Sequence, residues 1–162
     1  MKEQRVFRLR DIHSQVQMYN LQDKGYEEVF IRGINGQKEI FLFKPFFHES
    51  PRHAILVFEI AEYLKTFPKL KVKTYLSVKP DIVFEFNNQK WAVEVETGII
   101  LKKNKQQLQN KINNLNYYYE RNWFFVVTDR NIVKYYRRYG KTYTKRNVFR
   151  KINKIWMENI SN

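Results

Sequence analysis

Three acidic residues, Asp81, Glu94 and Glu96, lie in two short apolar segments of this 162-residue chain. PDIVFEF begins at Pro80 and WAVEVETG begins at Trp91. Side chains alternate between the two faces of a strand, so the carboxylates are expected on one face and the large apolar side chains on the other. Carboxylate oxygens suit a hard cation, and bound Mg²⁺ or Mn²⁺ can polarise a phosphoryl oxygen and help to deprotonate water. The pattern therefore predicts a metal centre for phosphodiester hydrolysis.

The two segments are expected to pair as a β-hairpin around residues 87–90. If these four residues form the turn, Phe86 pairs with Trp91, Asp81 lies across from Glu96 and Glu94 lies on the diagonal. Directly opposed Cβ atoms are about 4.5–5.5 Å apart, and diagonal ones under about 7–8 Å. Like charges at such distances destabilise a sheet. A divalent cation between them would remove that cost.

The surrounding patterns predict the elements that must position the acids. From residue 51 they indicate a helix to about 66, a strand at 70–78, the hairpin strands 81–86 and 91–96, a helix at about 100–120, a strand at 123–127 and a helix at about 129–139. This order, helix–three strands–helix–strand, predicts an α/β domain over residues 50–162, with a mixed central sheet flanked by helices. Its basic tail is expected to end in a helix at 145–157. Residues 1–49 are expected to form a small β-containing extension, with a strand at 6–9, a helix at 12–21 and a hairpin at 28–43.

The charge of the chain predicts a polyanionic partner. Thirty Lys and Arg residues oppose 16 Asp and Glu residues, for a net charge of +14. Nucleic acid is the commonest such partner, and an anionic membrane surface is the rival. We expect no membrane-spanning segment, because no apolar run reaches about 18 residues. Cysteine is absent, which excludes thiolate metal sites and fits a cytoplasmic protein. The cations expected to bind phosphate are Lys103, Arg130, Lys134, Arg137, Arg138, Lys141, Lys145 and Arg146.

These motifs and their order resemble the PD-(D/E)xK nuclease superfamily, which has a restriction-endonuclease-like fold. Pro80-Asp81 matches the PD element, and Glu94-Val95-Glu96 matches (D/E)-x-K except that Glu96 stands at the lysine position. KPDIVFEF and WAVEVETG, with Lys111-Ile112 and Tyr117-Tyr118 after them, resemble more narrowly the replication-relaxation family of plasmids and integrative elements. The resemblance covers about residues 50–130. It implies a Mg²⁺-dependent DNA endonuclease of a mobile element, with Asp81, Glu94 and Glu96 at the metal.

The resemblance also implies residues outside the hairpin. Some restriction enzymes of the superfamily carry Glu at the lysine position and remain active, and the lysine can come from elsewhere in space. Lys103, Gln107 and Lys111 lie about one turn apart along the following helix. The spacing does not choose among them, and we take Lys111 as the candidate catalytic lysine. The family often adds a glutamate from the first helix, for which Glu59 is preferred over Glu62. Many such nucleases cut duplexes as dimers, so a homodimer is one arrangement that the resemblance implies.

Two other functional hypotheses compete with that of a nuclease. The glutamate at position 96 favours a non-cleaving DNA-binding accessory protein of plasmid replication or mobilisation that keeps the fold. Charge alone would also allow a structural or membrane-surface adaptor, but the ordered carboxylates argue against it.

Overall fold

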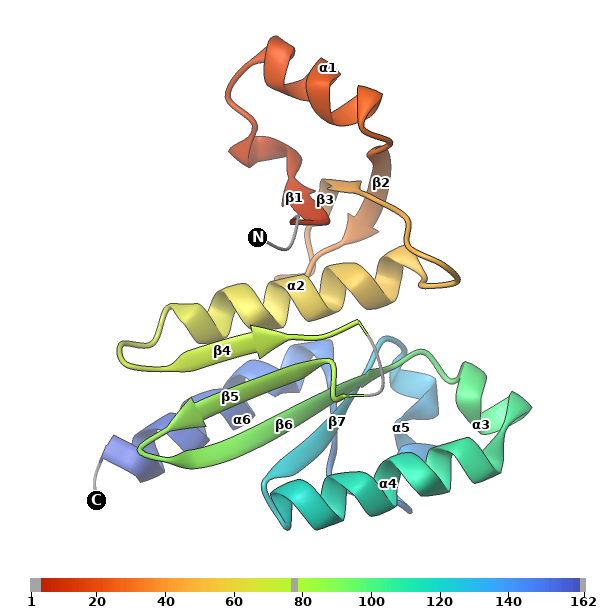
Figure 1. Ribbon diagram of the computed structural model, residues 1–162, viewed down its shortest axis with the longest axis vertical. Coiled ribbons are helices and arrows are strands. Elements are labelled where there is room, and N and C mark those ends of the chain that lie inside the picture. Colours follow the sequence, from red (N-terminus) through yellow and green to blue (C-terminus); the bar gives the residue numbers. More distant parts are fainter. Residues whose placement is uncertain (1–3, 77–78, 161–162) are drawn as a thin grey trace. The chain divides into compact units, whose positions relative to one another are not determined.

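The computed structural model describes residues 4–76 and 79–160, which form two compact units divided between Phe58 and Glu59. The chain is an α/β protein with a small N-terminal antiparallel sheet and a five-stranded mixed sheet flanked by helices (Figure 1). Helix α2, Pro51–Lys65, contributes its first half to one unit and its second half to the other. The broad fold class predicted from the sequence is therefore confirmed.

The first unit is built on a three-stranded sheet in the order β1-β3-β2, all antiparallel. Its strands are β1 Val6–Arg8, β2 Glu27–Arg32 and β3 Lys38–Phe43. A 3₁₀ turn, η1 Leu9–Asp11, and helix α1 Gln15–Asp23 connect β1 to β2. Alternate side chains of the sheet form a core with the start of α2, consisting of Val6, Phe41, Phe43, Ala54 and Ile55. The predicted hairpin at 28–43 is present as β2 and β3.

The second unit is built on a sheet in the order β4-β5-β6-β7-β8. Strands β4 Lys71–Thr74, β5 Ile82–Phe86 and β6 Gln89–Glu96 are antiparallel, and β7 Trp123–Val127 and β8 Thr142–Thr144 continue the sheet in parallel. Two helices, α3 Ile99–Lys103 and α4 Lys105–Tyr119, make the crossover from β6 to β7. The 3₁₀ turn η2 Arg130–Ile132 and helix α5 Val133–Tyr136 follow β7, and helix α6 Lys145–Ile160 ends the unit.

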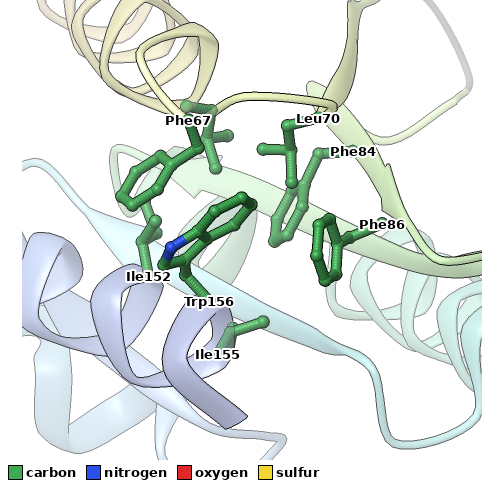
Figure 2. A pocket seen from close by; sticks show the side chains of 8 residues that line it. Phe67, Leu70, Phe84, Phe86, Ile152, Ile155 and Trp156 are labelled. Atoms are coloured by element: carbon green, nitrogen blue, oxygen red, sulfur yellow. The ribbon is translucent and has the colours of Figure 1, made fainter. Parts of the chain in front are cut away.

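Helices cover both faces of this sheet. On one face, Ala92, Phe125 and Val127 pack with Leu108 and Ile112 of α4, and Val133 and Tyr136 of α5 join the same cluster. On the other face, Phe84 and Phe86 of β5 converge with the end of α2 and with α6, as Figure 2 shows. The rings of Phe86 and Trp156 are 4.7 Å apart between centroids. The buried strand β7 lies between these layers, as its continuous apolar run predicts.

The hairpin of β5 and β6 has a tighter turn than predicted. Phe86 pairs with Gln89 and Phe84 pairs with Trp91, so only Asn87 and Asn88 form the turn. Both asparagines have positive φ, 47° and 63°, as the central residues of a type I′ turn require. The predicted pairing of Phe86 with Trp91 is therefore wrong by two residues, although the same side chains still share each face.

Several element boundaries also differ from the sequence prediction. The helix expected over 100–120 is divided at Asn104, whose side chain accepts a hydrogen bond from Gln107 N at 2.9 Å and caps α4. The helix expected over 129–139 is the 3₁₀ turn η2 followed by the short α5. Strand β8 lies where only basic tail was expected. The strand expected over 70–78 is observed as Lys71–Thr74, and residues 77–78 lie outside the described residues.

Candidate functional site

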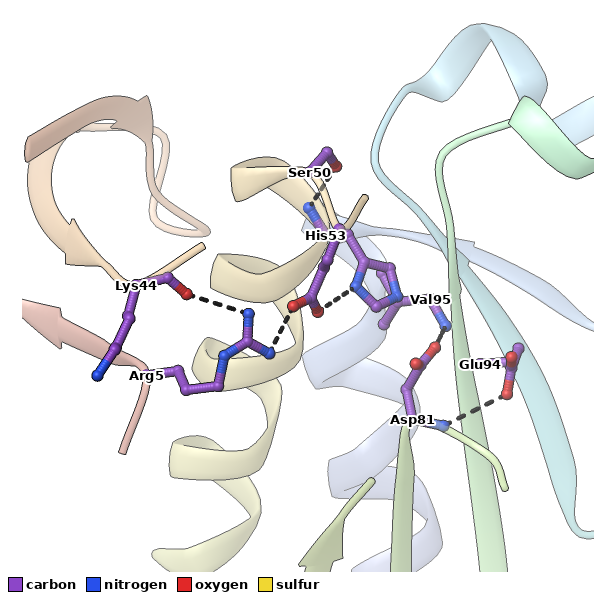
Figure 3. A network of polar contacts seen from close by, with 8 residues as sticks. Arg5, Lys44, Ser50, His53, Asp81, Glu94 and Val95 are labelled. Carbon is purple, nitrogen blue, oxygen red and sulfur yellow. Dashed lines mark hydrogen bonds and ion pairs between the residues drawn. The ribbon is translucent and has the colours of Figure 1, made fainter. Parts of the chain in front are cut away.

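The pairing of β5 with β6 brings Asp81 close to Glu94. Ile82 pairs with Val93, so in the continued register Asp81 lies opposite Glu94 and diagonal to Glu96, the reverse of the predicted arrangement. Asp81 Oδ2 accepts a hydrogen bond from Val95 N at 2.8 Å, and Asp81 N donates a long one, 3.4 Å, to Glu94 Oε2 (Figure 3). The carboxylate of Asp81 is thus fixed against the backbone of the strand that carries both glutamates.

Glu94 and Glu96 point from β6 into the layer covered by α4 and α5. Their residues are only 4% and 5% exposed, because this face of the strand is packed beneath the helices. The strand ends directly after Glu96, where Gly98 adopts a φ of +89° and the chain turns into α3. A side chain at that position would be strained, since positive φ favours glycine. Two acidic groups are therefore held in a region with little access to water.

Lys111 supplies the positive charge for both glutamates. Its side chain reaches from α4, and Nζ contacts Glu94 Oε1 and lies 2.9 Å from Glu96 Oε1. The lysine side chain is 31% exposed, whereas each glutamate side chain is 6% exposed. Of the three polar residues that sequence spacing placed along this helix, Lys111 is the one that meets the acids. Lys103 ends α3 and is exposed.

Tyr136 binds the remaining oxygen of Glu96. Its hydroxyl donates a hydrogen bond to Glu96 Oε2 at 2.8 Å, and the residue is fully buried. Glu96 is therefore held from two directions, by Lys111 and by Tyr136. Sequence analysis did not identify this tyrosine, because its neighbours in the chain give no sign of a partner 40 positions away. The general rule that a buried tyrosine hydroxyl finds a hydrogen-bond partner is the only signal available.

Burial and charge shift the proton affinities of these groups. Burial raises the pKa of Glu94 to about 8, and the nearby charge of Asp81 adds to the increase while Lys111 opposes it. Burial alone would lower the pKa of Lys111, but the charges of Glu94 and Glu96 outweigh burial and raise it. Burial and the charge of Glu96 also raise the pKa of the Tyr136 hydroxyl. Lys111 therefore stays protonated, and Glu94 is poised to exchange a proton near neutral pH.

The structure does not gather all the predicted metal ligands. Within residues 4–76 and 79–160, no group of three or more Asp, Glu, His or Cys side chains is arranged to hold a metal ion. Glu59 is buried on α2, whose C-terminal half packs on the sheet face opposite to Glu94 and Glu96. Asp81, Glu94 and Glu96 therefore lie close together with Lys111, whereas Glu59 lies on the other side of the sheet, and metal binding by these residues stays a prediction.

The cations predicted to bind phosphate lie on several elements. Lys145 at the start of α6 is half-buried, and the others are exposed. Arg130 is in η2 and Lys134 is in α5, the helix that also carries Tyr136. Arg137, Arg138 and Lys141 lie between α5 and β8, and Arg146 is in α6. These cations therefore lie before and after Tyr136, the residue that binds Glu96, along the chain.

Comparison with known proteins gives no family assignment. No family model matches the chain, and no curated protein and no solved structure matches it. Among the described residues, no helix is both long and apolar enough to span a membrane.

Proposed function

We propose that the chain is a divalent-metal-dependent DNA endonuclease of the PD-(D/E)xK type, as its motifs suggest. The observation that carries the proposal is the contact of Lys111 Nζ with both Glu94 and Glu96, beside Asp81. The chain lacks a lysine at position 96, and α4 brings one to the same carboxylates from 15 residues further along. An aspartate, a glutamate and a lysine thus lie close together, which supports the proposal that Lys111 takes the part of the motif's lysine.

The donor set fits a hard cation held by two carboxylates. Mg²⁺ commonly binds one or two protein carboxylates and completes its shell with water and substrate phosphate. Asp81 and Glu94 are the residues that would hold it, since the charge of Asp81 already raises the pKa of Glu94. When bound, such an ion supplies Lewis-acid polarisation of a phosphoryl oxygen and charge neutralisation. We leave Glu59 out of this ligand set and assign Glu96 to holding Lys111.

The protein residues have separate roles in this proposal. Lys111 keeps its proton, so its ammonium group can donate hydrogen bonds to a phosphate oxygen or to water but cannot serve as a base. Tyr136 and Glu96 fix the direction of the lysine side chain. Glu94 would hold the cation as its carboxylate, so metal binding would release the proton that burial favours on this group. The excess of lysine and arginine supplies affinity for the phosphate backbone.

A non-cleaving DNA-binding protein is the second candidate, and one observation favours it. Lys111 already neutralises part of the charge of Glu94 and Glu96, so the cluster can exist as an ion pair without a metal. In that case the exposed cations would bind DNA, and Lys111, Glu94 and Glu96 would serve only to hold α4 on β6.

One assay separates the two candidates. The protein is incubated with plasmid, single-stranded and branched DNA in Mg²⁺ or Mn²⁺, alongside Asp81→Ala and the control Glu85→Gln. Glu85 lies near the turn of the same hairpin and contacts only the exposed Lys71 among the ion pairs seen, so its loss should leave cleavage unchanged. Nicking that disappears in Asp81→Ala alone supports the endonuclease. Salt-sensitive binding with no cleavage in either metal supports the accessory protein.

A further inference from the structure

Two adjacent tyrosines near the end of α4 are exposed to solvent. Tyr117 is 80% exposed and Tyr118 is 70% exposed, while Tyr119 beside them packs against the core. Their ring centroids are 4.9 Å apart and the rings are perpendicular. Large aromatic rings bury a great deal of apolar area when they contribute to folding, and these two contribute little. Both rings are therefore accessible to a binding partner.

The tyrosines continue a polar surface along the helix. The outward positions Gln106, Asn110 and Asn113 precede Tyr117 at helical spacing, and Gln106 donates to Asn110 at 3.1 Å. Gln109 donates to Asn113 at 3.0 Å on the same side. The inward side of the helix is apolar, with Leu108, Ile112 and Leu115 buried. The outer face of α4, defined by these four amides with Tyr117 and Tyr118, thus offers hydrogen-bonding groups followed by two aromatic rings.

The charged residues within α3 and α4 are all positive, and the exposed Glu120 follows at the C-cap. The sequence has no acidic residue between Glu96 and Glu120. Lys102, Lys103 and Lys105 are exposed where α3 meets α4, at the end of the helix away from the tyrosines. A phosphate backbone along the helix would meet these lysines without repulsion from a carboxylate on this stretch. The exposed lysines of this stretch therefore favour a polyanionic partner over a cationic one.

From these observations we propose that Tyr117 and Tyr118 stack on unpaired bases of single-stranded DNA lying along the outer face of α4. Bases inside a duplex are already covered by their neighbours, whereas those of a single strand can stack on an aromatic side chain. The lysines at the α3–α4 junction bind phosphates of the same strand. This inference rests on the proposed function only in taking DNA as the partner, and it narrows the substrate to DNA with unpaired bases.

Binding measured without cleavage tests the inference. Fluorescence anisotropy in EDTA compares a labelled single-stranded oligonucleotide with a blunt duplex of equal length, for the full chain and for variants. Removing one base–aromatic stack costs about 1–3 kcal/mol, so Tyr117→Ala/Tyr118→Ala should weaken single-strand binding at least about tenfold. Tyr117→Phe/Tyr118→Phe keeps the rings and should bind within about twofold of wild type. Tyr19→Ala, which removes a tyrosine 62% exposed on α1, is the matched control.

The outcomes separate this inference from the proposed function. Selective loss of single-strand affinity in the alanine variant, with an unchanged slope of affinity against salt, supports stacking. Unchanged binding, or equal loss for both DNA forms, overturns it. Preference of the wild type for the duplex also overturns it. Metal-dependent nicking by wild type but not by Asp81→Ala would keep the endonuclease proposal in each of these cases.

Discussion

Replacing Lys111 with methionine should destabilise the protein in a pH-dependent way. Methionine keeps most of the side-chain volume and removes the ammonium group that contacts Glu94 and Glu96. Breaking a buried ion pair by removing one partner typically costs about 3–5 kcal/mol. We expect a loss of about 3 kcal/mol in the free energy of unfolding at pH 9, since the lysine side chain is 31% exposed and partly screened.

The loss should be smaller at pH 6, because Glu94 can then take up a proton. The pKa of Glu94 is already about 8, and loss of Lys111 raises it further. A folded-state pKa raised above the unfolded value means that stability falls as pH rises towards that pKa. If the substitution raises the pKa of Glu94 by one unit, the loss in the free energy of unfolding should be larger at pH 9 than at pH 6 by up to about 1.4 kcal/mol.

Urea denaturation at pH 6 and pH 9 measures the loss in the free energy of unfolding and its dependence on pH. Lys103→Met, which changes an exposed lysine on α3, is the control and should shift stability by less than about 0.5 kcal/mol. The variant Lys111→Met/Glu94→Gln/Glu96→Gln should recover much of the loss, since no buried charge is left unpaired. Equal losses for Lys111→Met at the two pH values, or wild-type stability at pH 9, would show that this lysine does not neutralise the glutamates.

Three other substitutions probe the same region. Glu94→Gln should flatten the pH dependence of stability, because wild type loses stability between about pH 4.5 and pH 8 as Glu94 ionises; unfolding free energies across that range check this, and parallel curves would contradict it. Tyr136→Phe should cost about 1–3 kcal/mol by leaving Glu96 Oε2 without its donor, as measured by urea denaturation. Asn88→Val should cost about 1–2 kcal/mol because valine disfavours a φ of 63°; an unchanged midpoint of thermal unfolding would count against the two-residue turn.

The sequence determines which residues share a face more firmly than which residues pair. Alternation along β5 and β6 correctly placed Glu94 and Glu96 together, because a side-chain period of two survives a shift of two residues. The residue that lies opposite Asp81 depends on the length of the turn between β5 and β6. Two consecutive asparagines both adopt positive φ, which shortens the loop to two residues and moves Asp81 from Glu96 to Glu94.

The contacts of Lys111 and Tyr136 show a second limit of prediction from sequence. In one continuous helix, Lys103 and Lys111 would lie near the same side. The cap at Asn104 divides the predicted helix into α3 and α4, and Lys111 is the lysine of this pair that belongs to α4 and reaches β6. The contact between Tyr136 and Glu96 joins α5 to the end of β6 and requires the parallel pairing of β6 with β7. Local patterns predict helices and strands, whereas contacts made across a crossover depend on the completed sheet.

The crossover through α3 and α4 also governs when this cluster assembles during synthesis. A nascent chain that ends before Trp123 contains Asp81, Glu94 and Glu96, but β6 then has no neighbour on one edge. Its carboxylates remain hydrated until β7 is added and α5 supplies the tyrosine hydroxyl. Pairings between distant parts of a chain form late because loop closure must come first. The buried arrangement of Glu94 and Glu96 is therefore complete only once β7 and α5 have joined β6.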